Sequence, residues 1–167
     1  MTLVAVNVNL APFCATKYIA VVLLGLLLAA CSTGVVVHDQ DRAAELLVDF
    51  LTAIKSDEGI QLSYDWTDDK FKEEITFSEF SRIVASIRMQ NRRADIRLRG
   101  YEVFGPVELI VVYADSQTAD ATIYYRFVLV GTKIKDYYLL DLFVDDKEFE
   151  KEGVYRDYGQ TIVVKGV

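Results

Sequence analysis

The chain of 167 residues is long enough for one folded domain behind a leader, and its 52% hydrophobic and 26% charged residues exclude a disordered chain. Its formal net charge of −7 argues against nucleic acid as a main partner and against broad electrostatic adsorption to anionic lipid, because both need a basic surface.

Residues 1–30 predict an export signal. Lys17 is their only charged side chain, and the apolar run 19–28 follows it directly. Two alanines then precede Cys31. A positive start, an apolar stretch of about 7–15 residues and a small-residue cleavage site are the three parts of such a signal. Residues 1–16 are uncharged and fit no usual positive region, which indicates an over-extended translation start.

The end of this segment, Leu28-Ala29-Ala30-Cys31, resembles the lipobox of bacterial lipoproteins. The resemblance implies a diacylglycerol on Cys31, cleavage before it and acylation of the new amino terminus. It places the mature protein in the cell envelope, held by its lipid, and Ser32 favours the periplasmic face of the outer membrane where the host has one. Cleavage removes Cys14, and lipidation then explains the lone cysteine that is left.

Two alternatives to the lipobox remain open. One is an uncleaved transmembrane helix, although the apolar run is shorter than the roughly 20 residues that spanning requires. The other is a plain secretory signal. For the mature chain we expect a lipidated tether at 31–40, a domain at 41–146 and a C-terminal tail at 147–167 with a possible extra strand.

Three helical segments are predicted in the first half of the domain. Apolar residues three and four apart favour a helix at 41–55. A shorter helix or turn is expected at 62–72, with Ser63 as its cap and Gly59 ending the segment before it. Thr76-Phe77-Ser78-Glu79 is a capping box that opens the third helix. The buried stripe predicted for this helix consists of Phe80, Ile83, Val84 and Ile87.

Two clusters of charged residues near these helices can be considered as a calcium site and an anion site. Asp65, Asp68 and Asp69 lack the central glycine and closing glutamate of a calcium loop. The arginines from Arg88 to Arg99 suggest an anion site, but a helix end with Asn91 as its left-handed cap and an exposed strand explain them better.

From position 94 the pattern alternates as in strands, and four are predicted, at 94–104, 107–114, 119–130 and 135–145. Short connections, one of them placed at 115–117, make the sheet antiparallel. The alternation changes phase at Gly100, which indicates a β-bulge.

Helices followed by an antiparallel sheet of about four strands define an α+β fold. The order of elements and the bend at Gly100 resemble the nuclear transport factor 2-like, or cystatin-like cone, superfamily over about residues 41–145. The resemblance implies N-terminal helices packed on a curved sheet around a pocket. The superfamily includes ketosteroid isomerase, but most of its members bind ligands or act as scaffolds. The fold alone therefore does not identify a function.

No nucleophile elbow, Cys/His pair, phosphate-binding glycine loop or metal-ligand spacing occurs in the sequence, so neither a cofactor nor a metal is predicted. The favoured hypothesis is a non-catalytic domain that binds a small apolar ligand or an envelope protein partner. Its candidate ligand-binding residues are Trp66, Tyr125, Tyr137 and Asp141.

Two alternative functions are kept. In the first, an isomerase-like enzyme transfers a proton with Asp141 as its base, because a carboxylate in an apolar strand has a raised pKa when it is buried. The competing interpretation is that Asp141 faces solvent or pairs with Arg126. In the second alternative the protein is a structural homodimer that uses the open face of its sheet.

Overall fold

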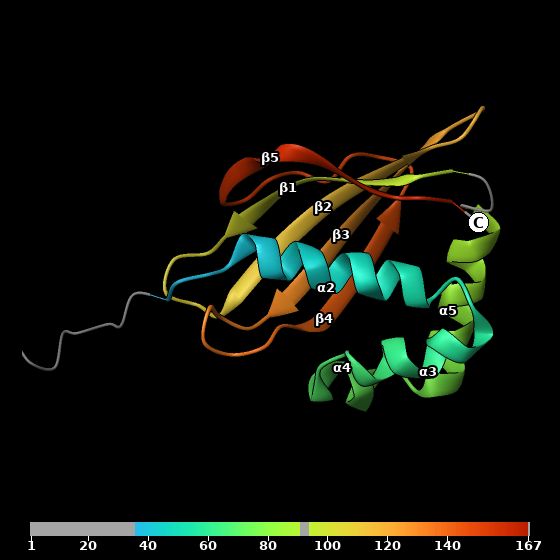
Figure 1. Ribbon diagram of the computed structural model, residues 1–167, viewed down its shortest axis with the longest axis horizontal. Coiled ribbons are helices and arrows are strands. Elements are labelled where there is room, and N and C mark those ends of the chain that lie inside the picture. The colour runs from blue at the N-terminus through green and yellow to red at the C-terminus, as the bar shows by residue number, and fades with distance from the viewer. Residues whose placement is uncertain (1–35, 91–93, 167) are drawn as a thin grey trace, which may run out of the picture. The chain divides into compact units, whose positions relative to one another are not determined.

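The computed structural model describes residues 36–90 and 94–166, with Gln90 given by its backbone alone. The leader, Cys31 and the expected helix cap at Asn91 lie outside the described residues, so these remain predictions. Within the described ranges, helices come first and an antiparallel sheet follows (Figure 1). The predicted α+β class is confirmed.

The described part contains four helices, whose bounds are α2 Gln40–Ala53, α3 Asp57–Asp65, α4 Asp69–Glu74 and α5 Phe77–Gln90. α2 agrees with the predicted first helix and starts where the Asp39 carboxylate accepts a hydrogen bond from the amide of Arg42 at 3.1 Å. Such a side chain satisfies one of the amides that a helix start leaves free.

The predicted second segment is two helices, α3 and α4, and the prediction of Ser63 as a cap is wrong. Ser56 caps α3 by accepting from the amide of Gly59 at 3.1 Å, so Gly59 lies in the first turn of a helix. A Cβ at Gly59 would lie 2.1 Å from the carbonyl oxygen of Ala53, which leaves room for glycine alone. Ser63 is buried, and its hydroxyl donates to the carbonyl of Gly59.

The capping box of α5 is confirmed. The amide of Thr76 donates to Oε2 of Glu79 at 3.0 Å, and the amide of Glu79 donates to the Thr76 hydroxyl at 3.3 Å. Phe80 and Val84 are buried as expected, but Ile83 is exposed. α5 packs at the periphery and therefore buries a stripe narrower than the sequence suggested.

The sheet has five strands, one more than predicted, in the order β4-β3-β2-β1-β5 with every neighbouring pair antiparallel. Their bounds are β1 Ile96–Val103, β2 Leu109–Gln117, β3 Thr122–Val130, β4 Tyr138–Asp145 and β5 Val154–Val164. The fifth strand comes from the C-terminal tail and pairs along β1.

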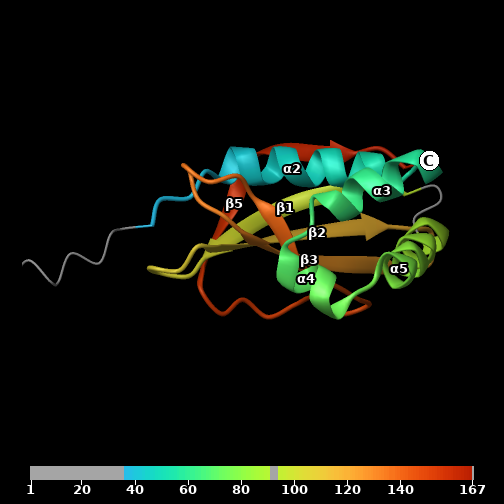
Figure 2. The same ribbon diagram turned by 90° about the horizontal axis from the view of Figure 1, so that it is seen from below.

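β4 and β5 lie at opposite edges, so residues 146–153, which we call the crossing segment, must traverse one face of the sheet. In Figure 2 this segment runs along the side of the sheet opposite α2. Its side chains follow that path, because Phe149 lies beside Arg126 of β3 and Lys151 lies over Tyr113 of β2.

The turn predicted at 115–117 is wrong, because β2 continues to Gln117. Ser116 pairs with Ile96 on one side and Ile123 on the other. The chain reverses a few residues later, where the amide of Thr118 donates to the carbonyl of Ala121 at 2.9 Å.

The predicted bulge in β1 is confirmed, since the register shifts between Leu98 and Gly100 against both neighbouring strands. Gly100 is required there because a Cβ would lie 2.4 Å from the carbonyl oxygen of Arg156 in β5. The bulge lets Leu98 and then Tyr101 contribute to the same face of the sheet, the one that packs on the helices.

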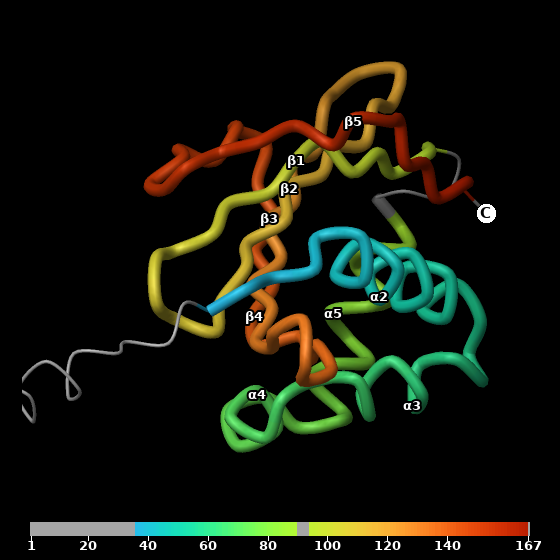
Figure 3. Tube along the Cα trace, turned by 60° about the vertical axis from the view of Figure 1, so that its left-hand side comes forward, coloured from blue at the N-terminus to red at the C-terminus, as the bar shows by residue number. Residues whose placement is uncertain are grey.

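The hydrophobic core lies between that face and the helices, and Figure 3 shows α2 and α5 on one side of the sheet. Its largest buried side chains include Phe50 of α2, Phe80 of α5 and Phe127 of β3. α4 lies beside the edge strand β4, where Thr67 forms a bridge to Leu139 and protects part of the edge.

Candidate functional site

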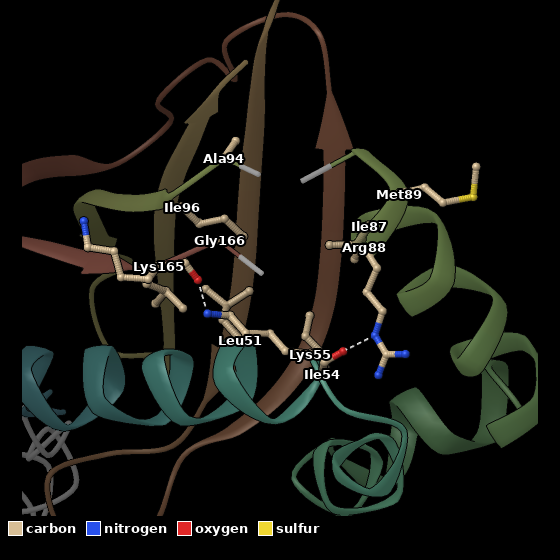
Figure 4. Close-up of a pocket in the computed structure, with 11 residues that line it drawn as sticks. Leu51, Ile54, Lys55, Ile87, Arg88, Met89, Ala94, Ile96, Lys165 and Gly166 are labelled. Carbon is tan, nitrogen blue, oxygen red and sulfur yellow. Dashed lines mark hydrogen bonds between the residues drawn. The ribbon is translucent and has the colours of Figure 1, made fainter. Parts of the chain in front are cut away.

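An apolar cavity of about 270 Å³ opens where the ends of α2 and α5 meet the start of β1 and the end of β5 (Figure 4). Its apolar lining residues are Leu51, Ile54, Ile87, Met89, Ala94, Ile96 and Val164. Ligand pockets span about 300–1,000 Å³, so this cavity suits a small ligand or one end of a longer one.

The strand pairing explains why this corner is apolar and hollow. Ile96 and Val164 are register partners on β1 and β5, and both turn toward the helices. Leu51 and Ile54 face them from the last turn of α2. Ala94, two residues before the start of β1, carries only a methyl group, so the wall is recessed there.

Arg88 forms one side of the rim and ties three segments together. Its guanidinium donates to the carbonyls of Ile54 and Ser56 and pairs with the carboxylate of Asp57. The free carbonyls at the end of α2 therefore receive a cation, which suits the negative end of a helix. The rim at this side is positive and held in place.

Two lysines form the other side of the rim. The ammonium of Lys55 donates to the carbonyl of Lys165, as Figure 4 shows. The Lys165 ammonium pairs with Asp95 at 2.9 Å, and the amide of Gly166 donates to the same carboxylate. The hydrogen bond from Lys165 is the main cause that lowers the pKa of Asp95. The cavity thus has an apolar wall under a rim on which the charged side chains among the described residues are three cations.

A second cavity, of about 380 Å³ and mainly polar, lies on the opposite face of the sheet under the crossing segment. The side chains from the sheet that line it include Arg99, Tyr113, Asp115, Tyr124 and Tyr155. Lys151 of the crossing segment places its ammonium 5.2 Å from the ring centre of Tyr113 and 5.5 Å from that of Tyr155. These cation–π contacts hold the segment against the sheet.

Glu102 lies beside this polar cavity and is fully buried. Its Oε2 accepts from the hydroxyl of Tyr113 at 2.9 Å and from the amide of Glu152 at 3.4 Å, while its Oε1 has no hydrogen-bond partner among the described residues. No local pattern indicates this buried carboxylate, because alternation alone assigns Glu102 to a solvated face. Only the path of the crossing segment buries it.

Of the four residues proposed from the sequence, Trp66 and Tyr137 lie together. Both line a third cavity, of about 380 Å³, beside the start of α2. The Tyr137 hydroxyl accepts from the amide of Asp39 at 2.8 Å, and burial raises its pKa. Tyr125 is instead part of the core, where it stacks on Phe127.

Asp141 lies away from the other three. The pairs Val128–Asp141 and Leu129–Leu139 are separated by a second bulge, so Asp141 points to the face opposite that of Leu139. It is half-buried, and its Oδ1 accepts from the amide of Leu142 at 2.8 Å. Residues two apart share a face in a regular strand, so alternation alone would place Asp141 with Leu139, and the bulge separates them.

Arg126, the expected partner of Asp141, makes other contacts. Its guanidinium lies 4.2 Å from the ring centre of Phe143 and 5.5 Å from that of Phe149. The four predicted site residues therefore do not form one site. The apolar cavity is lined by residues from two predicted helices, the first predicted strand and the predicted C-terminal tail.

Among the residues that the structure describes, no cluster of three or more His, Cys, Asp or Glu side chains could hold a metal ion. None of the helices in the described part is long and apolar enough to cross a membrane. Comparisons with known protein families, with curated proteins and with solved structures find no match. The fold and its cavity define the class: an α+β domain with an apolar pocket between helices and sheet.

Proposed function

We propose that this protein is a cell-envelope lipoprotein, anchored through Cys31, whose domain binds a small, mainly apolar ligand without catalysing a reaction. The apolar cavity between α2, α5, β1 and β5 carries the proposal. It combines a continuous apolar lining with polar groups confined to the rim, which is the usual composition of a ligand pocket. The cystatin-like cone resemblance agrees with a pocket between helices and sheet.

The charges on the rim favour apolar ligands that also carry an acidic group. Lys55, Arg88 and Lys165 are the charged side chains among its described lining residues, and all three are cationic. A ligand with an apolar body and one acidic group would bury the body in the cavity and leave the acid near these cations. Since each cation already has a partner in the protein, the apolar body supplies most of the affinity.

A substitution that fills the apolar cavity tests whether a ligand binds there. Ala94→Phe extends a ring from the recessed wall into the cavity, whereas Ala121→Phe adds the same ring in an exposed turn and serves as the matched control. Binding of 1-anilinonaphthalene-8-sulfonate, an apolar dye with one acidic group, is followed by fluorescence. We expect the Ala94 variant to bind at least about tenfold more weakly, as the loss of one well-buried contact implies. Equal binding by both variants would remove the cavity from the proposal.

The anchor is tested separately. Cells are fed a fatty-acid analogue that carries a reactive tag, and the protein is isolated and examined for the tag. We expect label on the wild-type chain and none on Cys31→Ala. Label that survives this substitution contradicts lipidation at Cys31.

A further inference from the structure

Exposed aliphatic side chains gather at one end of the sheet. They are Val37, Val107, Ile134 and Val154, with 54%, 42%, 96% and 61% of their surfaces exposed. Val37 precedes α2, Val107 lies in the β1–β2 connection, Ile134 lies in the β3–β4 connection, and Val154 begins β5. Figure 1 shows the β1–β2 and β3–β4 connections at the end of the sheet where the described chain begins.

Hydrogen bonds hold these segments side by side. The amide of Lys133 donates to the carbonyl of Val37 at 2.8 Å, which places Ile134 next to the start of the chain. Nε2 of His38 donates to the carbonyl of Val107 at 3.1 Å, so the β1–β2 connection is fixed to the same segment. Val154 pairs with the last residue of β1 and completes the cluster from the other edge.

The chain length to the proposed anchor sets the distance to a bilayer. Cys31 lies five residues before Val36, the first described residue. Five residues span at most about 18 Å when fully extended. A diacylglycerol on Cys31 would therefore keep the four aliphatic side chains within reach of the membrane surface.

From this placement we infer that the end of the sheet formed by Val37, Val107, Ile134 and Val154 rests on the lipid bilayer and inserts its aliphatic side chains among the headgroups. The inference rests on the proposed lipid anchor at Cys31 and names the surface that meets the membrane.

Two carboxylates near this end of the sheet are each paired with a cation. The carboxylate of Glu108 pairs with Lys135 at 2.6 Å, and that of Asp136 pairs with Arg42 at 2.7 Å. These acidic groups therefore repel anionic headgroups little. Lys133 is exposed beside Ile134, and no described carboxylate forms an ion pair with it. Separate aliphatic tips on turns fit between headgroups, whereas a protein partner would be served better by a groove.

The experiment uses the full lipidated chain in vesicles of phosphatidylethanolamine and phosphatidylglycerol whose acyl chains carry bromine. Ile134→Cys and Val107→Cys are labelled with an environment-sensitive fluorophore. Met89→Cys is the matched control, because Met89 is 80% exposed at the end of α5 and lines the mouth of the apolar cavity. We expect bromine to quench most of the fluorescence at positions 134 and 107 and none at position 89.

Flotation of the same vesicles separates the two failures. A chain that floats with the vesicles but shows equal quenching at all three positions, or none at any, overturns the membrane-facing surface and leaves the anchor intact. A chain that stays in the soluble fraction overturns the anchor, and the membrane-facing surface with it.

Discussion

The hydroxyl of Tyr113 donates a hydrogen bond to Oε2 of the fully buried Glu102 across the β1–β2 pair, at 2.9 Å. A buried carboxyl group that loses a donor keeps the cost of its desolvation and loses a hydrogen bond that offset it. We therefore expect Tyr113→Phe to lower the free energy of unfolding by about 1–3 kcal/mol, measured by chemical denaturation. Glu102→Gln keeps an oxygen that accepts from Tyr113 and should be tolerated better than Tyr113→Phe.

Tyr124→Phe is the control for this pair. Tyr124 lies on the same face of the sheet and lines the same polar cavity. Because no hydrogen bond from its hydroxyl to a buried group is present in the described part, the substitution should change stability by less than about 0.5 kcal/mol. Equal losses for the two tyrosines would mean that the Glu102 contact contributes nothing of its own.

Alkaline pH should destabilise the domain. Burial, followed by the hydrogen bond to Asp157, raises the pKa of Tyr155 to about 12, and burial also raises the pKa of Tyr113 and Tyr158. Above about pH 10 the unfolded tyrosines lose protons that the folded ones retain. Stability is thus fully present below pH 10 and falls as pH rises toward 12, because the unfolded state then binds fewer protons.

Denaturation curves recorded at several pH values from neutral to alkaline measure this fall. Tyr155→Phe removes one of the shifted groups and should make the fall shallower. A stability that stays level between pH 10 and 12 would contradict the raised pKa values.

Gly100→Ala should disturb the β-bulge. The added methyl would lie 2.4 Å from the carbonyl oxygen of Arg156, a backbone atom that moves only if β1 and β5 separate. We expect a loss of about 1–3 kcal/mol in the free energy of unfolding, as for other overpacked sites. Gly159→Ala in β5 is the matched control, because nothing lies within 4 Å of its added methyl. Faster amide exchange in β5 of the Gly100 variant alone would confirm the cause.

Thr76→Ala should cost about 1 kcal/mol of stability, the usual loss on removing such a cap, while Thr76→Ser keeps the hydroxyl and should cost little. The hydrogen bond from the Thr76 hydroxyl is the main cause that lowers the pKa of Glu79. That contribution is present above about pH 4 and is lost as Glu79 becomes protonated. The stability difference between wild type and Thr76→Ala, measured by denaturation, should therefore shrink in acid. A difference that grows in acid would be the opposite result.

Local signals in the sequence predicted much of the fold. The capping box at Thr76, the phase change at Gly100 and the apolar stripe of α2 each depend on residues within a few positions of one another. The predictions of these features are correct because they depend on neighbouring residues and not on distant contacts. The pattern of the C-terminal tail does not distinguish a fifth strand from a loose end, because that strand is held by its pairing with β1.

The candidate site was harder to predict, because it depends on which distant segments meet. Ala94 precedes the first strand of the sheet and Val164 ends the last one. No local pattern indicates that these two residues share a cavity with Ile87. The bulge between the Val128 and Leu129 pairs turned Asp141 to the other face, and its sequence carries no glycine as a signal. Burial of Glu102 likewise depends on a segment about 50 residues away.

The length of α2 sets the distance between the start of the domain and the apolar cavity. Its first turn lies beside Val37 and His38, while its last turn supplies Leu51 and Ile54 to the apolar cavity. Fourteen residues rising about 1.5 Å each make the helix about 21 Å long. For a chain held at Cys31, this helix acts as a spacer between bilayer and cavity mouth. Under the proposed anchor, a molecule dissolved in the membrane would therefore have to leave it before binding in the cavity.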